Sequence, residues 1–347
     1  MPKLRVASIN GEWMNNWFTT DGSPAAFLET FKLPGEAEPN STLKTASRLA
    51  GVIRAIDADI LALQEAPSRK EELDLFITTH LAGPAAPLYS GILGDSGGAQ
   101  KLALLYKPAS VTATLAPSAG LQTLLNEWIA DVDGDMLLEP YEFTRRPLVV
   151  DIRAGAHQLQ VLVMHTKSNF VNQGQALWLD PARRQEYVVA ALKARRRNAT
   201  EGMRTRKYLE EQLTASPSAR IILLGDLNDG PGLDYFEENY LAHNVTDILV
   251  GSAFTPEWIF NHAQHDVPSD QRFTAVFDDF VENVQNKRLL LDHILLSPEL
   301  TGAAGLRKVP SSGRIHHEDY EAQLANGGAR REDRPSDHRP VSVELEF

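Results

Sequence analysis

The chain has 347 residues, of which 43% are hydrophobic, so it is long enough for one large or two small domains with a sizeable core. Its 34 Lys and Arg against 46 Asp and Glu give a net charge of −12, which excludes a general basic nucleic-acid-binding protein but leaves room for a local basic groove. Cysteine is absent, which excludes disulfides, thiolate metal ligands and cysteine nucleophiles.

The N-terminal stretch MPKLRVASIN has no apolar segment of signal-peptide length. No apolar run approaches the roughly 18 residues that a membrane span needs. We therefore expect a soluble, cytoplasmic protein without a membrane span. A secreted protein whose signal peptide was removed stays open as the alternative, and no feature indicates a protein partner.

Apolar runs bounded by Gly, Pro or Asp recur along the chain and predict buried strands. They cover residues 4–10, 59–65, 101–107, 147–152, 159–166, 220–227, 289–297 and 339–347. Between them, helical patterns predict a helix at 41–56 and one long helix or two at 182–213. Polar stretches at 11–40, 252–288 and 307–336 are expected to be surface loops.

Strands alternate with helices, yet some strands follow one another through short loops. This order favours an α/β fold with a pair of mixed sheets over a purely doubly wound sheet. No repeat or low-complexity linker divides the chain. We therefore expect a single domain over residues 1–347.

Several predicted strands end on polar residues that a core does not accommodate well. Carboxylate, amide and imidazole groups occupy these ends: Asn10, Glu65, His165, Asp226, Asn228, Asp292 and His338, the last preceded by Asp337. If the sheets align these ends, the groups converge on one pocket. Oxygen ligands with imidazole suit a hard divalent cation and acid–base chemistry. Asp226 and Asn228 alternate in GDLND, so both are expected to face this pocket.

The segments LALQE (61–65), GDLND (225–229), LDH (291–293) and SDHRPV (336–341), with Asn10 and His165, resemble the successive motifs of the endonuclease/exonuclease/phosphatase superfamily. This is the DNase I-like and exonuclease III-like group. The resemblance spans nearly the whole chain. It implies a four-layer α/β/β/α sandwich of two mixed β-sheets flanked by helices, with the site at one edge.

The resemblance also implies roles for the motif residues. Glu65 would be the principal ligand of Mg²⁺, or of Mn²⁺ in its place, and Asn10 and Asp337 would lie beside the metal. Asp226 and Asn228 would hold the attacking water or a second ion.

Two histidines follow from the same resemblance. His338 would act as general base or as transition-state stabiliser, with Asp292 orienting its ring. His165 would contact the phosphate or the leaving oxygen.

Substrate-binding residues are also implied by the resemblance. Arg145, in TRRPLVV, matches a place where relatives carry a phosphate-contacting arginine, with a simple surface arginine as the alternative. Lys167 and Ser168, in HTKS, resemble an HLKS variant of the family and would bond phosphate oxygens.

The chain departs from the family pattern at three positions. Gln100 stands where DNase I-like members place a glutamate that supports the first histidine, which puts the support of His165 in doubt. Pro67 stands where abasic-site nucleases carry a lysine. Glu12 adds an acid near the expected metal. These departures argue against a standard DNA-repair enzyme.

Several features carry two interpretations. In DVDGDMLLEPYE (131–142), Asp131, Asp133, Asp135 and Glu142 occupy positions 1, 3, 5 and 12 of a calcium loop, but Met136 replaces the glycine of position 6, so we favour a solvated acidic loop over a structural Ca²⁺ site.

We interpret the basic stretch 193–207 as a solvated helix face, in preference to a surface that binds a phosphate backbone. For the aromatic residues Trp13, Trp17 and Phe18, we favour a role in packing at a sheet edge over a role in base stacking. His293, His316 and His317 lie in no recognisable motif and are interpreted as incidental.

We therefore expect a Mg²⁺-dependent phosphodiester hydrolase that acts on a phosphate ester as an endonuclease, with DNA or RNA as substrate. A phosphatase or a small-molecule or lipid-headgroup phosphodiesterase on the same scaffold is the alternative. A non-enzymatic binding protein is disfavoured because every central motif residue is present.

Overall fold

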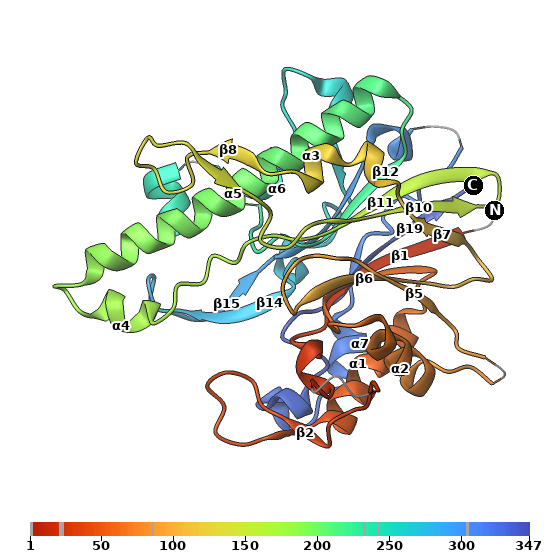
Figure 1. Cartoon of the computed structure of the whole chain (residues 1–347), viewed down its shortest axis with the longest axis horizontal. Helices are drawn as coiled ribbons and strands as arrows, with labels where there is room; N and C mark the ends of the chain where they lie inside the picture. The colour runs from red at the N-terminus through yellow and green to blue at the C-terminus, as the bar shows by residue number, and fades with distance from the viewer. Residues whose placement is uncertain (1–2, 21–23, 85, 232–233, 242, 303–304) are drawn as a thin grey trace.

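The computed structural model describes residues 3–20, 24–84, 86–231, 234–241, 243–302 and 305–347. Two β-sheets pack face to face, and helices cover the outer face of each (Figure 1). The four-layer α/β/β/α sandwich of two mixed sheets predicted from the sequence is confirmed.

The first sheet contains strands from both ends of the chain. They are β1 (Lys3–Asn10), β4 (Ile60–Ala66), β5 (Ser90–Leu93), β6 (Lys101–Tyr106), β17 (Arg307–Lys308), β18 (Arg314–Ile315) and β19 (Val341–Glu346). The order is β17-β19-β1-β4-β6-β5, with β18 also paired to β19. Only β1 and β4 are parallel neighbours among these described strands.

The second sheet comes from the middle of the chain. Its strands are β7 (Thr112–Leu115), β10 (Leu148–Ala154), β11 (His157–His165), β12 (Ile221–Asp226), β13 (Asn261–His262) and β16 (Asp292–Leu296). The order is β13-β16-β12-β11-β10-β7, and β11 and β12 are parallel. Three two-stranded ribbons lie outside the sheets: β2 (Thr30–Phe31) with β3 (Asn40–Ser41), β8 (Trp128–Ala130) with β9 (Glu139–Tyr141), and β14 (Ala275–Asp279) with β15 (Val284–Leu289).

The α-helices among the described residues are α1 (Thr42–Ile56), α2 (Lys70–His80), α3 (Gln122–Leu125), α4 (Gly174–Leu179), α5 (Arg184–Ala215), α6 (Val245–Val250) and α7 (His317–Glu321). Short 3₁₀ or π turns occupy Met14–Trp17, Ser118–Gly120, Glu237–Leu241, Pro256–Trp258, Ser269–Gln271, Pro298–Thr301, Asn326–Gly328 and Arg331–Asp333. The stretch predicted as one long helix or two is the single helix α5. Across the described ranges, no helix is long and apolar enough to cross a bilayer.

Strand alternation explains the layers. In β4, Ile60 and Ala62 pack against the second sheet, whereas Leu61 and Leu63 pack beneath α1 and α2. Successive side chains of a strand point to opposite faces, so a strand that is apolar on both faces belongs between two layers. The second sheet is covered in the same way by α5, whose Leu209 lies in its outer core.

Three sequence expectations require correction. The predicted strand 289–297 is broken, since β15 ends at Leu289 and β16 begins at Asp292 in a different sheet. The expected surface loop 11–40 folds inward, because Trp17 and Phe18 are fully buried beneath α1 and α2. The helix α2 was not expected.

The three aromatic residues of this segment differ in their exposure to solvent. Trp17 and Phe18 pack at the sheet edge, as expected, and Trp13 keeps 37% of its surface exposed.

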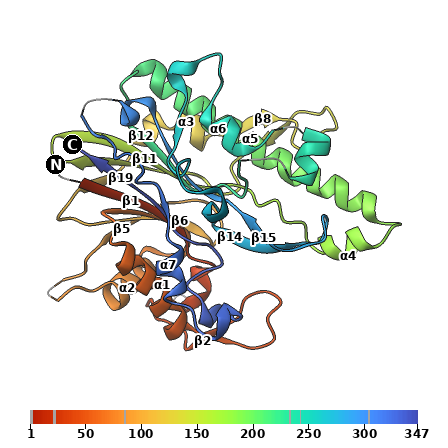
Figure 2. The same ribbon diagram turned by 180° about the vertical axis from the view of Figure 1, so that it is seen from behind.

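The two parallel pairs place four strand ends at one edge of the sandwich. The register pairs Asn10 with Gln64 and His165 with Asp226, and Asp292 at the start of antiparallel β16 pairs with Asp226. Figures 1 and 2 show α4, the N-terminal part of α5 and the β14–β15 ribbon extending beyond the sheets, joined by a small core that includes Tyr187.

Candidate active site

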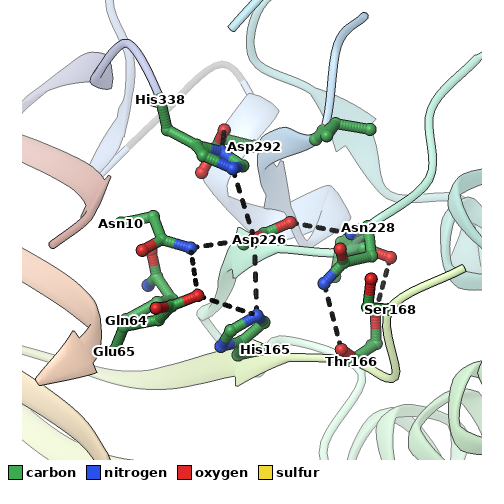
Figure 3. Close-up of polar contacts among 12 residues, drawn as sticks. Asn10, Gln64, Glu65, His165, Thr166, Ser168, Asp226, Asn228, Asp292 and His338 are labelled. Carbon is green, nitrogen blue, oxygen red and sulfur yellow. Dashed lines mark hydrogen bonds and ion pairs between the residues drawn. The ribbon is translucent and has the colours of Figure 1, made fainter. Parts of the chain in front are cut away.

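The amide of Asn10 links the two sheets at this edge. Its Nδ2 donates to Glu65 Oε1 at 3.3 Å and to Asp226 Oδ2 at 3.0 Å (Figure 3). Its backbone oxygen accepts from Ser336 Oγ at 2.7 Å, which ties the C-terminal SDH segment to the same point. Residues from three distant parts of the sequence therefore meet at Asn10.

Glu65 sits in a bulge at the end of β4. Its φ is +53°, and the register with β6 shifts between Leu63 and Ala66. A bulge re-aims a side chain, and a non-glycine residue with positive φ is held in place by its surroundings at a cost. The strand therefore ends with its carboxylate turned toward Asn10.

The Glu65 carboxylate accepts hydrogen bonds but has no arginine or lysine paired with it among the described residues. Trp13 N and Gln100 Nε2 each donate to its Oε2 at 2.8 Å. Burial and the nearby charge of Asp337 raise the pKa of Glu65 to about 7. A carboxylate that is this costly to ionise fits a divalent cation as its partner.

Asp226 ends β12 between both histidines. His165 Nε2 lies 3.4 Å and His338 Nε2 3.8 Å from its Oδ2, and Asn228 N donates to its Oδ1 at 2.8 Å. Burial raises the pKa of Asp226 to about 6. The preceding Gly225 is required here, because a Cβ at its φ of +142° would lie 1.9 Å from the Met164 oxygen.

His338 and Asp292 form a buried pair. His338 Nδ1 lies 2.7 Å from Asp292 Oδ2, which leaves Nε2 facing Asp226 and, at 4.0 Å, Asp337. Burial disfavours the charged ring, but Asp292, Asp226 and Asp337 outweigh it and raise the pKa of His338 well above its ordinary value. The raised pKa favours the imidazolium form.

His165 has the opposite character. It is buried at the end of β11, and its Nδ1 has no hydrogen-bond partner in the described part of the chain. Burial, then the charges of Arg145, His338 and Lys167, lower its pKa well below the usual value. His165 is therefore a neutral imidazole, 4.0 Å from Glu65 Oε1.

Gln100 does not support His165. It bridges instead: its Nε2 donates to Glu65, and its Oε1 accepts from Arg145 Nη2 at 2.8 Å. Arg145 also donates from Nη1 to Thr166 O at 3.3 Å. The doubt raised by the sequence about His165 is thus justified, and Gln100 connects Arg145 to the acidic cluster.

The structure also brings Lys167, Ser168 and Asn228 to this edge. Lys167 Nζ donates to Ser168 O at 2.9 Å, and Ser168 Oγ accepts from Phe170 N at 3.1 Å. Asn228, with φ +50°, donates from Nδ2 to Thr166 O at 3.1 Å. Its amide therefore braces the loop after β11 as well as lying beside Asp226 (Figure 3).

The donor set fits a hard cation. Asp226, Asp292 and His338 each place one ligand-capable atom within 4.8 Å of the others. Asp292 and His338 bond one another, however, so the oxygens of Glu65 and Asp226 are the better placed ligands, with the Nδ2 of Asn10 donating to both. Carboxylate and amide oxygens are the ligands that Mg²⁺ and Mn²⁺ prefer.

Glu12 is not an additional metal-side acid, which corrects the sequence expectation. Its carboxylate pairs with Arg331 Nε at 3.1 Å and Arg334 Nη2 at 2.5 Å. Only its backbone N–H reaches the site, donating to Asn10 Oδ1 at 2.9 Å.

The basic helix stretch is neither a solvated face nor a free phosphate track. Arg195 pairs with Asp234, Arg204 Nε donates to Thr123 O, and buried Arg206 bonds Glu210 and the carbonyls of 249, 250 and 258. These cations therefore hold covering segments onto α5.

In the acidic loop, Asp131 accepts from the backbone N–H groups of Gly134 and Met136, and Asp133 pairs with Lys193. These contacts engage two of its carboxylates without an ion.

The three histidines interpreted as incidental have structural partners. His293 bonds Asp229 O and His262, His316 bonds Asp319 and Ser342, and His317 bonds Gln271 O. Glu201 was missed by the sequence reasoning. Glu201 lies on the same face of the helix as Ala194, Asn198 and Thr205, which are all buried. A charged residue on such a face is the signal that could have revealed it.

The sequence model of the Endonuclease/Exonuclease/phosphatase family matches residues 29–338. No curated protein matches the chain by sequence.

Three solved structures are similar in fold. TDP2 of D. rerio, complexed with a single-strand DNA product, is 14% identical with a TM-score of 0.52, covering 99% of both chains. The human Nocturnin catalytic domain is 14% identical with a TM-score of 0.51, covering 100% of this chain and 95% of its own. A Bacteroides vulgatus endonuclease/exonuclease/phosphatase is 13% identical with a TM-score of 0.50, covering 100% of both chains.

Proposed function

The chain belongs to the Endonuclease/Exonuclease/phosphatase family, whose members are metal-dependent phosphoesterases, and we propose that it is a Mg²⁺-dependent phosphodiester hydrolase acting as an endonuclease. One observation carries this proposal. The carboxylates of Glu65 and Asp226 and the imidazoles of His165 and His338 meet at one edge of both sheets.

Glu65, Asp226 and Asp337 would hold the cation, with Asn10 beside it. Once bound, a divalent ion neutralises charge on the phosphate oxygens and helps to position the ester. Glu65 is suited to this role because its buried charge has no cationic side chain opposite it in the described structure.

Asp226 and Asn228 would orient the attacking water. Asp226 has a pKa of about 6, close to that of a useful proton acceptor at neutral pH. His338 faces Asp226 through Nε2 and is held by Asp292 through Nδ1. Of the two roles left open for His338, its raised pKa favours transition-state stabilisation, in which Nε2–H donates to a phosphoryl oxygen.

The remaining groups would bind the ester. His165 is buried and neutral, so it can donate a hydrogen bond without adding charge. Arg145, Lys167 and Ser168 supply further donors for phosphate oxygens on the far side of the cluster from His338. In-line attack requires the ester to be fixed between these two sides.

A nucleic acid is the substrate that we infer. TDP2 of D. rerio, which shares this fold, is bound to a single-strand DNA product. Exposed Trp13 and Phe170 lie within three residues of Asn10 and Lys167 respectively, where bases beside the scissile phosphate could stack.

A small phosphate ester is the second candidate, and a specific observation favours it. Arg195, Arg204 and Arg206 of the basic helix are engaged with other parts of the chain. These three cations are therefore not free to bind a long polyanion, and the net charge of −12 would repel it.

Hydrolysis assays separate these candidates. Plasmid DNA, single-stranded DNA and RNA would be incubated with purified protein beside bis- and mono-p-nitrophenyl phosphate, in Mg²⁺, Mn²⁺ or EDTA. Metal-dependent nicking of plasmid, absent from the Asp226→Ala variant, would support an endonuclease. Cleavage of small esters alone would support the second candidate, and no cleavage of any substrate would overturn both.

A further inference from the structure

Glu201 is a fully buried carboxylate near the middle of α5, outside the acidic cluster. No salt bridge to it is found in the described part of the chain, and its side chain faces a set of hydrogen-bond donors instead. Thr144 N and Tyr141 Oη donate to its Oε1 at 2.8 and 3.2 Å. Lys167 N donates to its Oε2 at 2.9 Å.

The two backbone donors, Thr144 N and Lys167 N, belong to two separate loops that carry the candidate phosphate-binding residues. Thr144 directly precedes Arg145, in the segment that follows β9. Lys167 and Ser168 follow β11. One carboxylate therefore joins the backbone beside Arg145 to the backbone of Lys167, and it does so from a rigid helix.

We propose that Glu201 is a positioning residue for phosphate binding, which fixes the spacing between Arg145 and the Lys167–Ser168 segment and so sets how tightly the site holds a phosphate ester. This inference rests on the proposed function and adds a residue to it. Glu201 acts through the loops, and its own carboxylate contacts no reacting group.

The chemistry of the contacts requires a carboxylate. Every group facing Glu201 is a donor, and an ionised carboxylate is an acceptor at both oxygens. A glutamine has only one acceptor oxygen. If that oxygen keeps Thr144 and Tyr141, the amide NH₂ opposes the Lys167 N–H, and the loop after β11 is displaced.

The charge of Glu201 also acts on Lys167. Burial lowers the pKa of Lys167, as does Arg145, whereas Glu201 opposes that shift. Burial raises the pKa of Glu201 itself, and the hydrogen bonds from Thr144, Lys167 and Tyr141 oppose that rise. The carboxylate thus favours the charged form of the lysine whose backbone it holds.

The test is a kinetic comparison of Glu201→Gln with Tyr141→Phe on bis-p-nitrophenyl phosphate in Mg²⁺. Tyr141→Phe is the matched control, since it removes a bond to the same carboxylate but leaves both backbone contacts. We expect Glu201→Gln to raise KM about tenfold, with a smaller change in kcat, because a hydrogen bond to a charged group is lost. Tyr141→Phe should stay within about twofold, as expected for a weaker neutral donor.

A double-mutant cycle with Lys167→Ala separates positioning from general stability. If Glu201 acts through Lys167, Glu201→Gln should change KM little once the lysine side chain is gone. Fully additive effects, or equal losses in Tyr141→Phe, would overturn the proposal. Glu201→Asp keeps the charge but is one methylene shorter, and it should reproduce the KM increase. This variant replaces Glu201→Gln in the test if Glu201→Gln does not fold.

Binding of inorganic phosphate, followed by calorimetry, keeps this inference distinct from the proposed function. Should the wild type cleave no ester, the proposed function fails. Weaker phosphate binding in Glu201→Gln than in the wild type would still support the positioning role. Equal binding in the two proteins, or none in the wild type, would overturn it.

Discussion

Glu12 and Glu65 lie close together near the ends of β1 and β4, and both are largely buried, with 3% and 13% of their side chains exposed. The charge of Asp337 acts on both, but their bonded partners differ. Glu12 is paired with two arginines, one of them, Arg331, fully buried. Glu65 meets N–H donors and the negative charge of Asp337.

This difference separates a structural acid from a functional one. A buried charge is costly unless it is paired. The pair for Glu12 comes from the chain itself and ties the 331–334 segment to the loop after β1. The pair for Glu65 must come from outside, which is why Glu65 is the better candidate ligand although both acids neighbour Asn10.

The largest expected effect is that of His338→Ala. Removing the group that stabilises the transition state should lower kcat by about 10²–10³-fold, measured by steady-state hydrolysis in Mg²⁺. The circular dichroism spectrum should be unchanged. His265→Ala is the control, because His265 is exposed and bonds His262 O. Turnover that survives in His338→Ala would show that the site is assigned wrongly.

Glu65→Gln should weaken the response to metal. In the wild type, we expect Mg²⁺ to raise the melting temperature, because it binds the folded state alone. Loss of a ligand should weaken that binding, and activity should fall by about 10–100-fold at a fixed Mg²⁺ concentration. A Mg²⁺ titration of the melting temperature measures this, and an unchanged titration would remove Glu65 from the metal site.

Glu12→Gln should instead reduce stability. It leaves Arg331 buried without its counter-charge, which typically costs about 3–5 kcal/mol. Urea unfolding measures the loss. At temperatures where the variant is folded, its midpoint for Mg²⁺ should match the wild type. A Glu12→Gln variant that is as stable as the wild type but does not respond to Mg²⁺ would contradict the structural role of Glu12.

A pH dependence should follow from Glu65, whose folded pKa is about 7 against an ordinary 4.5. Between these values the folded protein keeps a proton that the unfolded chain has released, so stability without metal should fall as pH rises to 7 and then level off. Mg²⁺ affinity should rise over the same range because binding needs the ionised form. Thermal melts from pH 5 to 8, with and without Mg²⁺, test both trends, and Glu65→Gln should make them shallower.

The smallest effect is expected from Asp133→Asn in the acidic loop. Asp133 is exposed and pairs with Lys193, so its loss should leave the melting temperature unchanged. Ca²⁺ should not shift the melting temperature of either protein. A Ca²⁺-induced rise seen in the wild type but not in the variant would instead establish a calcium site.

Much of the site was predictable because it is local in sequence. Asn10, Glu65, Asp226 and His338 each end or precede an apolar strand, where a polar residue is out of place unless it has a use. Gln100 and Glu201 were not predictable in the same way. The partners of Gln100 lie 35 and 45 residues away, and those of Glu201 lie 34 to 60 residues away. The helix α2 closely follows Glu65 in the sequence, and it was not predicted.

The sequence by itself determined the class of fold and the residue types of the site, because strand periodicity and strand-end polarity are written in consecutive residues. Only the tertiary structure decided which acids are paired. Arg331 and Arg334 lie more than 300 residues from Glu12, and no local pattern places them against it rather than against Glu65. Electrostatic pairing depends on distance in space, and the packing of the two sheets and their loops sets that distance.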